Sequence, residues 1–118
     1  MALHIDLGKK GEQLAEAFLV NRGHVIITRN WTWGKLEIDL ITVKDGKLHF
    51  TEVKCRSSQR MMRPEDSVNK KKLQYLFRAI DYYLYTHPQY DDFRFDILSV
   101  VVRDGYEPEY FYIEDVYY

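Results

Sequence analysis

The sequence has one cysteine, no long apolar run and almost no net charge, and each shortage excludes a class of protein. Cys55 alone cannot form an internal disulfide or a zinc site built from several cysteines. No apolar run approaches the roughly 18 to 20 residues that span a membrane. The first residues lack the apolar core and the cleavage site of a signal peptide. We therefore expect a cytoplasmic protein with no membrane partner.

The sequence does contain enough apolar material for one folded domain. Its 118 residues are 46% hydrophobic and 15% aromatic, which argues against disorder. The length predicts a single domain over residues 1–118. The net charge of −1 gives no overall attraction for nucleic acid.

Charged residues are nevertheless unevenly distributed. Residues 54–72 hold seven Lys or Arg against two acids, whereas residues 104–118 hold five acids and no base. A basic band of this kind can hold phosphates. Charge alone, however, favours an ordinary solvated loop and helix end.

Residues 36–56 predict two strands joined by a tight turn. Asp45-Gly46 between two strand-like runs is the strongest short-range hairpin signal in a sequence. Glu52 and Lys54 share a face of the second strand because they are two residues apart. Asp39 lies six residues before the turn and Glu52 six after it, so we expect them to be near neighbours across the ladder.

The remaining patterns predict the order αβββαββ. The expected elements are a helix over 8–22, a strand over 24–31 with a loop to 34, the hairpin, a loop over 57–64, a helix from Glu65 or Asp66 to Thr86, a central strand over 93–102 and an edge strand over 109–113. This is an α/β fold with a mixed sheet of about five strands flanked by helices. Trp31 and Trp33 either pack in the core or stack on a base or sugar. Asp96 either pairs with Arg94 or contacts a metal.

An acid on one strand followed by Glu-x-Lys on the next suits metal-dependent phosphodiester cleavage. Asp39 and Glu52 offer the oxygen ligands that Mg²⁺ prefers, and the Val53 carbonyl offers another. A bound metal polarises the phosphate and lowers the pKa of a water. Lys54 orients that water or stabilises the charge that develops.

The same pattern has a plainer explanation, because charged residues alternate on many exposed strands. A cross-strand Lys–Glu pair at a sheet edge would account for it. Apolar neighbours such as Ile38 and Phe50 indicate instead that these strands are buried. A buried charge needs a partner or a purpose.

Short motifs that match one known family are spread nearly end to end. They are Gly8–Glu12 with Ala15 and Leu19, Gly23, Arg29–Trp31, Glu37–Ile41, Phe50–Lys54 with Arg56, Val68 with Lys72, and Arg94–Asp96. In these motifs the chain resembles the YraN family of predicted endonucleases, which is related to archaeal Holliday-junction resolvases within the PD-(D/E)xK nuclease superfamily. The chain departs from the family pattern at Leu36, where the family usually has glycine, and in the loop over 57–63, which lacks glycine.

The resemblance implies a restriction-endonuclease-like core in which Asp39, Glu52 and Lys54 are catalytic. It implies Mg²⁺ or Mn²⁺ held by Asp39, Glu52, the Val53 carbonyl and Glu12, the extra helix acid of the resolvase-like branch. Glu12 also suits the start of a helix as an ordinary acid. The residues that would bind DNA phosphates are Arg56, Arg60, Arg63, Lys70, Lys71 and Lys72. Lys72 is otherwise an ordinary solvated lysine.

Three functions follow from these patterns. The first is a metal-dependent DNA endonuclease, acting on branched or recombination and repair DNA as a homodimer if the resolvase resemblance holds. The second is a non-catalytic DNA-binding or adaptor module with a nuclease fold. The third is a protein-interaction module that uses the acidic, tyrosine-rich C-terminus over 106–118. That segment would alternatively form the dimer interface or pack along the sheet edge.

Overall fold

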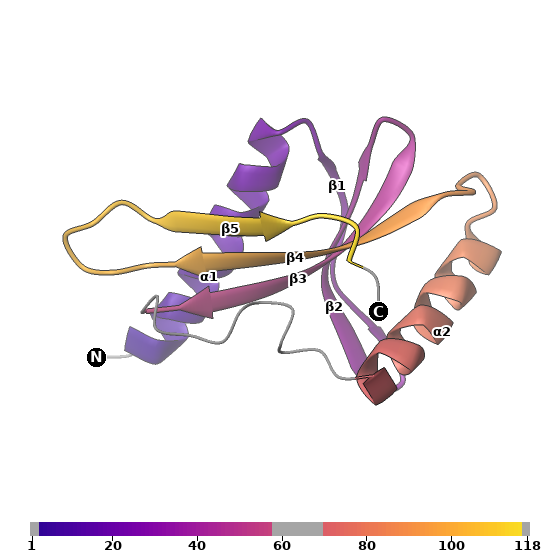
Figure 1. Ribbon diagram of the computed structural model, residues 1–118, viewed down its shortest axis with the longest axis horizontal. Coiled ribbons are helices and arrows are strands. Elements are labelled where there is room, and N and C mark those ends of the chain that lie inside the picture. The colour runs from indigo at the N-terminus through magenta and orange to yellow at the C-terminus, as the bar shows by residue number, and fades with distance from the viewer. Residues whose placement is uncertain (1–2, 58–69, 117–118) are drawn as a thin grey trace.

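The computed structural model describes residues 3–57 and 70–116 of the chain. Its elements are α1 (Leu3–Asn21), β1 (Val25–Trp33), β2 (Leu36–Lys44), β3 (Lys47–Arg56), α2 (Lys70–Thr86), β4 (Phe93–Val101) and β5 (Glu109–Ile113), as Figure 1 shows. The predicted α/β class and the order αβββαββ are confirmed, and the arrangement is consistent with a restriction-endonuclease-like fold. Within the described ranges, neither helix is long and apolar enough to cross a membrane.

The five strands form one mixed sheet in the order β1-β2-β3-β4-β5. β3 and β4 pair in parallel, and the other neighbours pair antiparallel. A parallel pair cannot be joined by a tight turn, so the chain crosses from β3 to β4 through the segment that contains α2. β5 lies at an edge, and residues 95–101 of β4 are all buried, as predicted.

The β2–β3 hairpin forms where the sequence predicts it. Lys44 pairs with Lys47 across the turn. Asp45 and Gly46 have φ values of 53° and 77°. A two-residue turn of this kind needs positive φ at both positions, which Asp and Gly tolerate better than most residues.

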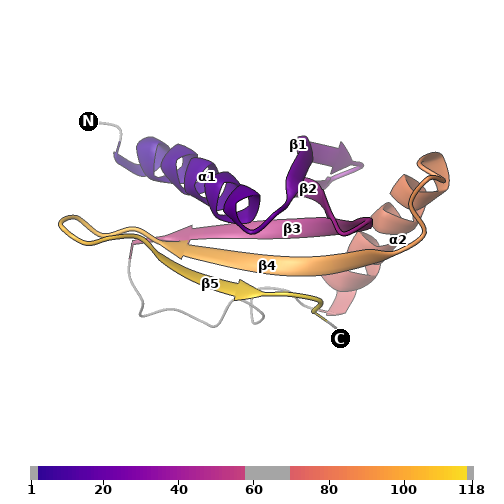
Figure 2. The ribbon, with the colours of Figure 1, turned by 90° about the horizontal axis from the view of Figure 1, so that it is seen from above.

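The two helices cover opposite faces of the sheet, because successive residues of a strand point to opposite sides. Leu98 of β4 packs with Ala15 and Leu19 of α1. Ile97, one residue earlier, packs with Ile80 of α2. Figure 2 shows α1 lying along one side of β3–β5, away from α2.

Two element boundaries differ from the sequence prediction. α1 begins at Leu3 rather than at residue 8. Gly11 therefore lies inside this helix. Cys55 of β3 occupies the space that a Cβ at this position would need, which accounts for a glycine there. β1 continues to Trp33, which pairs with Leu36, so the expected loop before the hairpin is strand. The start of the second helix at Glu65 or Asp66 falls outside the described residues.

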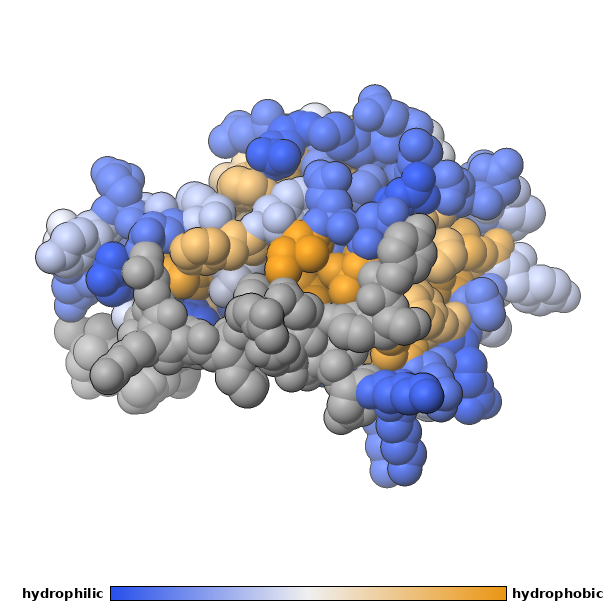
Figure 3. All heavy atoms as spheres, in the orientation of Figure 1, coloured by the Kyte–Doolittle hydropathy of each residue, from blue (hydrophilic) through white to orange (hydrophobic). Residues whose placement is uncertain are grey.

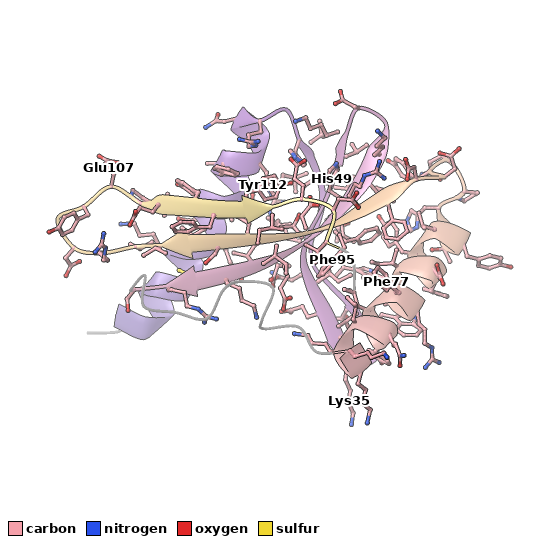
Figure 4. The ribbon with its side chains drawn as sticks, in the orientation of Figure 1. Lys35, His49, Phe77, Phe95, Glu107 and Tyr112 are labelled. Carbon is pink, nitrogen blue, oxygen red and sulfur yellow. The ribbon has the colours of Figure 1, made fainter. Side chains whose placement is uncertain are left out.

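Asp96 is fully buried in β4. One of the two roles predicted for it, pairing with Arg94, is wrong, because Arg94 pairs with Asp92 and Asp115. The Asp96 carboxylate accepts hydrogen bonds from the Tyr112 hydroxyl at 2.6 Å and the Asp115 N–H at 2.9 Å, and it lies 2.7 Å from Nδ1 of His49. Figure 4 shows His49 and Tyr112 close together near the centre of the molecule. A buried carboxylate with three partners ties β3, β4 and β5 together.

Part of the tyrosine-rich C-terminal segment packs within the chain. The Tyr110 ring stacks on Phe18 of α1 with centroids 4.7 Å apart, and Tyr112 meets the same ring edge-on at 5.6 Å. Edge packing therefore accounts for these two tyrosines.

Candidate active site

The sheet splits at the predicted catalytic residues. The β2–β3 ladder runs from the turn as far as Leu40, which pairs with Thr51. Beyond that point β2 pairs only with β1, and residues 52–56 of β3 pair only with β4. Figure 1 shows β2 and β3 diverging there. Asp39 and Glu52 are the first residues past the last rung, so both lie where the split opens.

Just past the end of the β2–β3 ladder, the Asp39 side chain makes the hydrogen bond between the two strands. Its Oδ2 accepts a hydrogen bond from the backbone N–H of Val53 at 2.7 Å. This contact fixes the carboxylate of β2 against β3, one residue from Glu52. A backbone donor that loses its strand partner is thereby satisfied.

Burial raises the pKa of the Asp39 carboxyl from 3.8 to about 6. The Val53 hydrogen bond opposes this change, and the nearby charges of Glu52, Glu37 and Glu12 add to it. Crowded negative charge in a partly desolvated position disfavours ionisation. A cation bound beside Asp39 would relieve that cost.

Glu52 and Lys54 lie on one face of β3, as predicted, and they contact each other. The Lys54 Nζ is 3.2 Å from Oε1 of Glu52. The Nζ of Lys72, which comes from α2, is 3.0 Å from the same oxygen. Lys72 therefore belongs to the site rather than to the open surface. Arg56 shares the face of Glu52 and Lys54 by alternation and is half-buried at the end of β3.

Glu12 and Glu52 line different hollows, and Asp39 lines the one that contains Glu12. Glu12, exposed on α1, lines a hollow with Asp39 and Val53. Glu52 lines another with Glu37 and Lys72. Among the side chains that the structure describes, in 8–57 and 70–116, no three of His, Cys, Asp or Glu are arranged to hold a metal ion.

The donors at the split are of the chemical type that a hard cation takes. Mg²⁺ binds proteins through one or two carboxylates and fills its remaining positions with waters and substrate phosphates. Asp39 and Glu52 are two such carboxylates, and Val53, whose N–H contacts Asp39, follows Glu52 in β3. Burial is the main cause of the raised pKa of Asp39, and the neighbouring carboxylates of Glu52, Glu37 and Glu12 add to it.

A basic groove lies next to the Glu52 hollow. Its lining comprises Lys35, Lys71, Lys72, Gln74, Tyr75 and Arg78. Lys72 lines both the groove and the hollow, so the two are adjacent. Figure 3 shows hydrophilic side chains projecting at the lower end of the molecule, and Figure 4 places Lys35 there beside the start of α2.

Sequence reasoning found part of this groove. Of the predicted phosphate-binding residues, Lys71 and Lys72 line it, and Lys70 is exposed beside them at the start of α2. Arg78 was missed, although its spacing of seven residues from Lys71 places both on one helix face. Lys35 was also missed, because only the tertiary fold brings the β1–β2 turn to α2. Arg60 and Arg63 lie outside the described residues.

Comparison with known proteins relates this chain to one protein family along nearly its whole length. The model of "Uncharacterised protein family UPF0102" matches residues 11–100. A UPF0102 protein of Flavobacterium psychrophilum is 41% identical over 119 residues, covering 100% of this chain and 98% of its own. A UPF0102 protein of Parabacteroides distasonis is 36% identical over 119 residues, covering 100% and 97%. A third, from Chloroherpeton thalassium, is 37% identical over 125 residues, covering 99% and 97%. The chain therefore belongs to the UPF0102 family.

Proposed function

We propose that this protein is a metal-dependent DNA endonuclease of the cytoplasm that hydrolyses phosphodiester bonds. The observation that carries the proposal is the split between β2 and β3. It brings the Asp39 carboxylate to the Val53 N–H, beside a Glu52–Lys54 pair on the same strand. Two acids, a backbone carbonyl and a lysine at one opening of a sheet are the groups that such cleavage uses.

Asp39, Glu52 and the Val53 carbonyl would hold Mg²⁺ or Mn²⁺, with Glu12 approaching from α1. When bound, the metal polarises the scissile phosphate and lowers the pKa of an attacking water. Lys54 orients that water or stabilises the negative charge that develops on the phosphate. Asp39 has to lose its proton first, because a protonated carboxyl is a poor ligand.

The basic groove would hold the DNA backbone beside these acids. Lys70, Lys71 and Lys72 at the start of α2 and Arg56 at the end of β3 approach from two elements, and Arg60 and Arg63 belong to the same predicted set. Such contacts position the DNA and carry no sequence information. The resolvase resemblance supports branched DNA as the substrate and a homodimer that places two sites on two strands.

Cleavage of a labelled DNA panel in Mg²⁺ and in Mn²⁺ tests the proposal. The panel holds duplex, single-stranded, flap and four-way junction DNA. We expect wild type to cut at least one substrate and Lys54→Ala to cut none. Lys47→Ala is the matched control, because Lys47 is another half-buried lysine of β3 at the hairpin end. Cleavage that is equal in wild type and Lys54→Ala, or absent from wild type, would refute the proposal.

A non-catalytic DNA-binding module is the second candidate. One observation favours it, because Oε1 of Glu52 already has two ammonium groups within 3.2 Å, from Lys54 and Lys72. The negative charge of Glu52 is therefore balanced by two lysines without a metal. The two functions predict different effects of metal on thermal stability, since a ligand that binds only the folded state raises the stability of that state. An endonuclease should gain thermal stability from Mg²⁺ or Mn²⁺ and lose that gain in Asp39→Ala, whereas a binding module should show neither effect.

A further inference from the structure

Cations and aromatic rings share one face of α2. Lys71, Tyr75, Arg78, Tyr82 and Tyr85 follow one another at spacings of four, three, four and three residues, which places them in one stripe. Tyr82 is 49% exposed and Tyr85 is 83% exposed. At about 1.5 Å per residue, the stripe is about 21 Å long. The rings of Tyr82 and Tyr85 therefore both present aromatic surface to the solvent side of the helix.

The tip of the β1–β2 hairpin lies against this stripe. The Trp33 ring centroid is 5.3 Å from that of Tyr75 and 6.1 Å from that of Tyr82. The Tyr75 hydroxyl accepts a hydrogen bond from the Lys35 N–H at 3.3 Å. Gly34 has a φ of 62°, and the same hydroxyl fills the space where its Cβ would be. Trp33 and Lys35 are thus held beside α2. Trp31, by contrast, packs edge-on against the buried Tyr83.

The chemistry of the stripe is that of a surface for single-stranded nucleic acid. Within α2, residues 70–86 include four Lys or Arg and one acid, Asp81. Proteins that bind single strands combine cations for the phosphates with aromatic faces on which successive bases stack. Duplex DNA buries its base faces in its own stack, so exposed tyrosines would add nothing to its binding.

We propose that this stripe binds a single-stranded segment of DNA, with the bases stacked on Tyr82, Tyr85 and Trp33. Lys35, Lys71 and Arg78 bind its phosphates. The inference rests on the proposed endonuclease function, because it assigns the part of the substrate that leads to the site. Lys72 joins the groove at the start of the stripe to the hollow at Glu52. The preferred substrate is therefore DNA whose unpaired strand adjoins the scissile phosphate, rather than a blunt duplex.

Fluorescence anisotropy of the full chain in EDTA tests the inference without any cleavage. The probes are an oligothymidylate of about twelve nucleotides and a blunt duplex of similar charge. We expect the double variant Tyr82→Ala/Tyr85→Ala to bind the single strand about tenfold more weakly or worse, with duplex affinity changed less than about twofold. Tyr82→Phe/Tyr85→Phe should restore the single-strand affinity, because it keeps the aromatic faces.

Tyr106→Ala is the matched control, because Tyr106 is 68% exposed but lies between β4 and β5, far from α2 in the chain. It should bind both probes as wild type does. Equal loss for both probes in the α2 variant, or no loss for either, would refute the inference, provided that its thermal melt matches wild type. Tyr85→Ala alone is the fallback if the double variant melts early, since Tyr85 is the most exposed of the rings.

The two proposals can fail separately. If wild type cuts flap DNA in a Lys54-dependent manner while the tyrosine variant binds like wild type, the endonuclease stands and the stripe does not. If wild type cuts nothing but binds the single strand through Tyr82 and Tyr85, the stripe is a binding site and the endonuclease proposal is wrong.

Discussion

The raised pKa of Asp39 makes the stability of the metal-free protein depend on this residue in an unusual direction. A carboxyl whose pKa is about 6 in the folded state, against 3.8 as a free group, holds its proton more tightly when folded. Its contribution to folding is therefore most favourable at low pH and declines as the pH rises from about 4 to about 6. Above pH 6 the folded state bears the full cost of the ionised carboxylate.

The magnitude follows from the shift of about two pKa units. At about 1.4 kcal/mol per unit, the upper bound is about 3 kcal/mol. Solvent screening at a half-buried side chain reduces this to about 1–2 kcal/mol. Asp39→Asn removes the charge while keeping an oxygen that can accept the Val53 hydrogen bond. At pH 8 we expect the variant to be more stable than wild type by that amount, which corresponds to a Tm higher by about 4 to 8 °C.

Urea unfolding in EDTA between pH 4 and pH 8 measures the difference. The advantage of Asp39→Asn should be present at pH 8 and shrink toward zero as the pH falls to 4. Asp81→Asn is the matched control, because Asp81 is exposed on α2, and its difference from wild type should not change with pH. A less stable Asp39→Asn at pH 8, or a difference independent of pH, would show that Asp39 is not an energetically costly carboxylate.

Three further outcomes follow from the same contacts. Below pH 6, protonation of Asp39 should weaken Mg²⁺ binding about tenfold per pH unit, measured by calorimetry at pH 5, 6 and 7.5. Gly11→Ala should destabilise the protein by about 1–3 kcal/mol in urea unfolding because its Cβ meets Cys55, whereas Gly8→Ala, with open space around it, should stabilise by about 0.5–1 kcal/mol. Burial of His24, followed by the His49 and Lys44 charges, lowers its pKa from 6.5 to about 4. The folded state therefore loses stability as the pH falls from 6.5 to 4, and His24→Gln should reduce that loss in acid unfolding curves.

The sequence predicted the elements that local patterns determine. The Asp45-Gly46 turn and the alternation around it specified the β2–β3 hairpin and the shared face of Glu52 and Lys54. The apolar run of β4 specified a strand buried on both faces. In each case the signal lies within a few residues, where side-chain period and turn geometry decide the structure.

The sequence did not predict the features that depend on residues far apart in the chain. At the split of the sheet an Asp39 oxygen accepts a hydrogen bond from the N–H of Val53, whereas alternation alone predicts an unbroken ladder. Lys72 reaches Glu52 across twenty residues of sequence. Asp96 is a partial exception. An acid inside an apolar strand predicts buried hydrogen-bond partners, but the sequence did not identify those partners.

The charge balance differs on the two sides of the split, and this identifies the residue that gains most from a cation. Glu52 is neutralised by Lys54 and Lys72, whose ammonium groups lie 3.2 and 3.0 Å from one oxygen. Asp39 has a backbone N–H as its hydrogen-bond donor, and its pKa is raised by burial and, in addition, by the carboxylates of Glu52, Glu37 and Glu12. A metal that binds Glu52 has to displace ammonium groups already present, whereas one that binds Asp39 relieves a repulsion. Metal affinity should therefore depend more on Asp39 than on Glu52, although the two carboxylates stand at the same opening of the sheet.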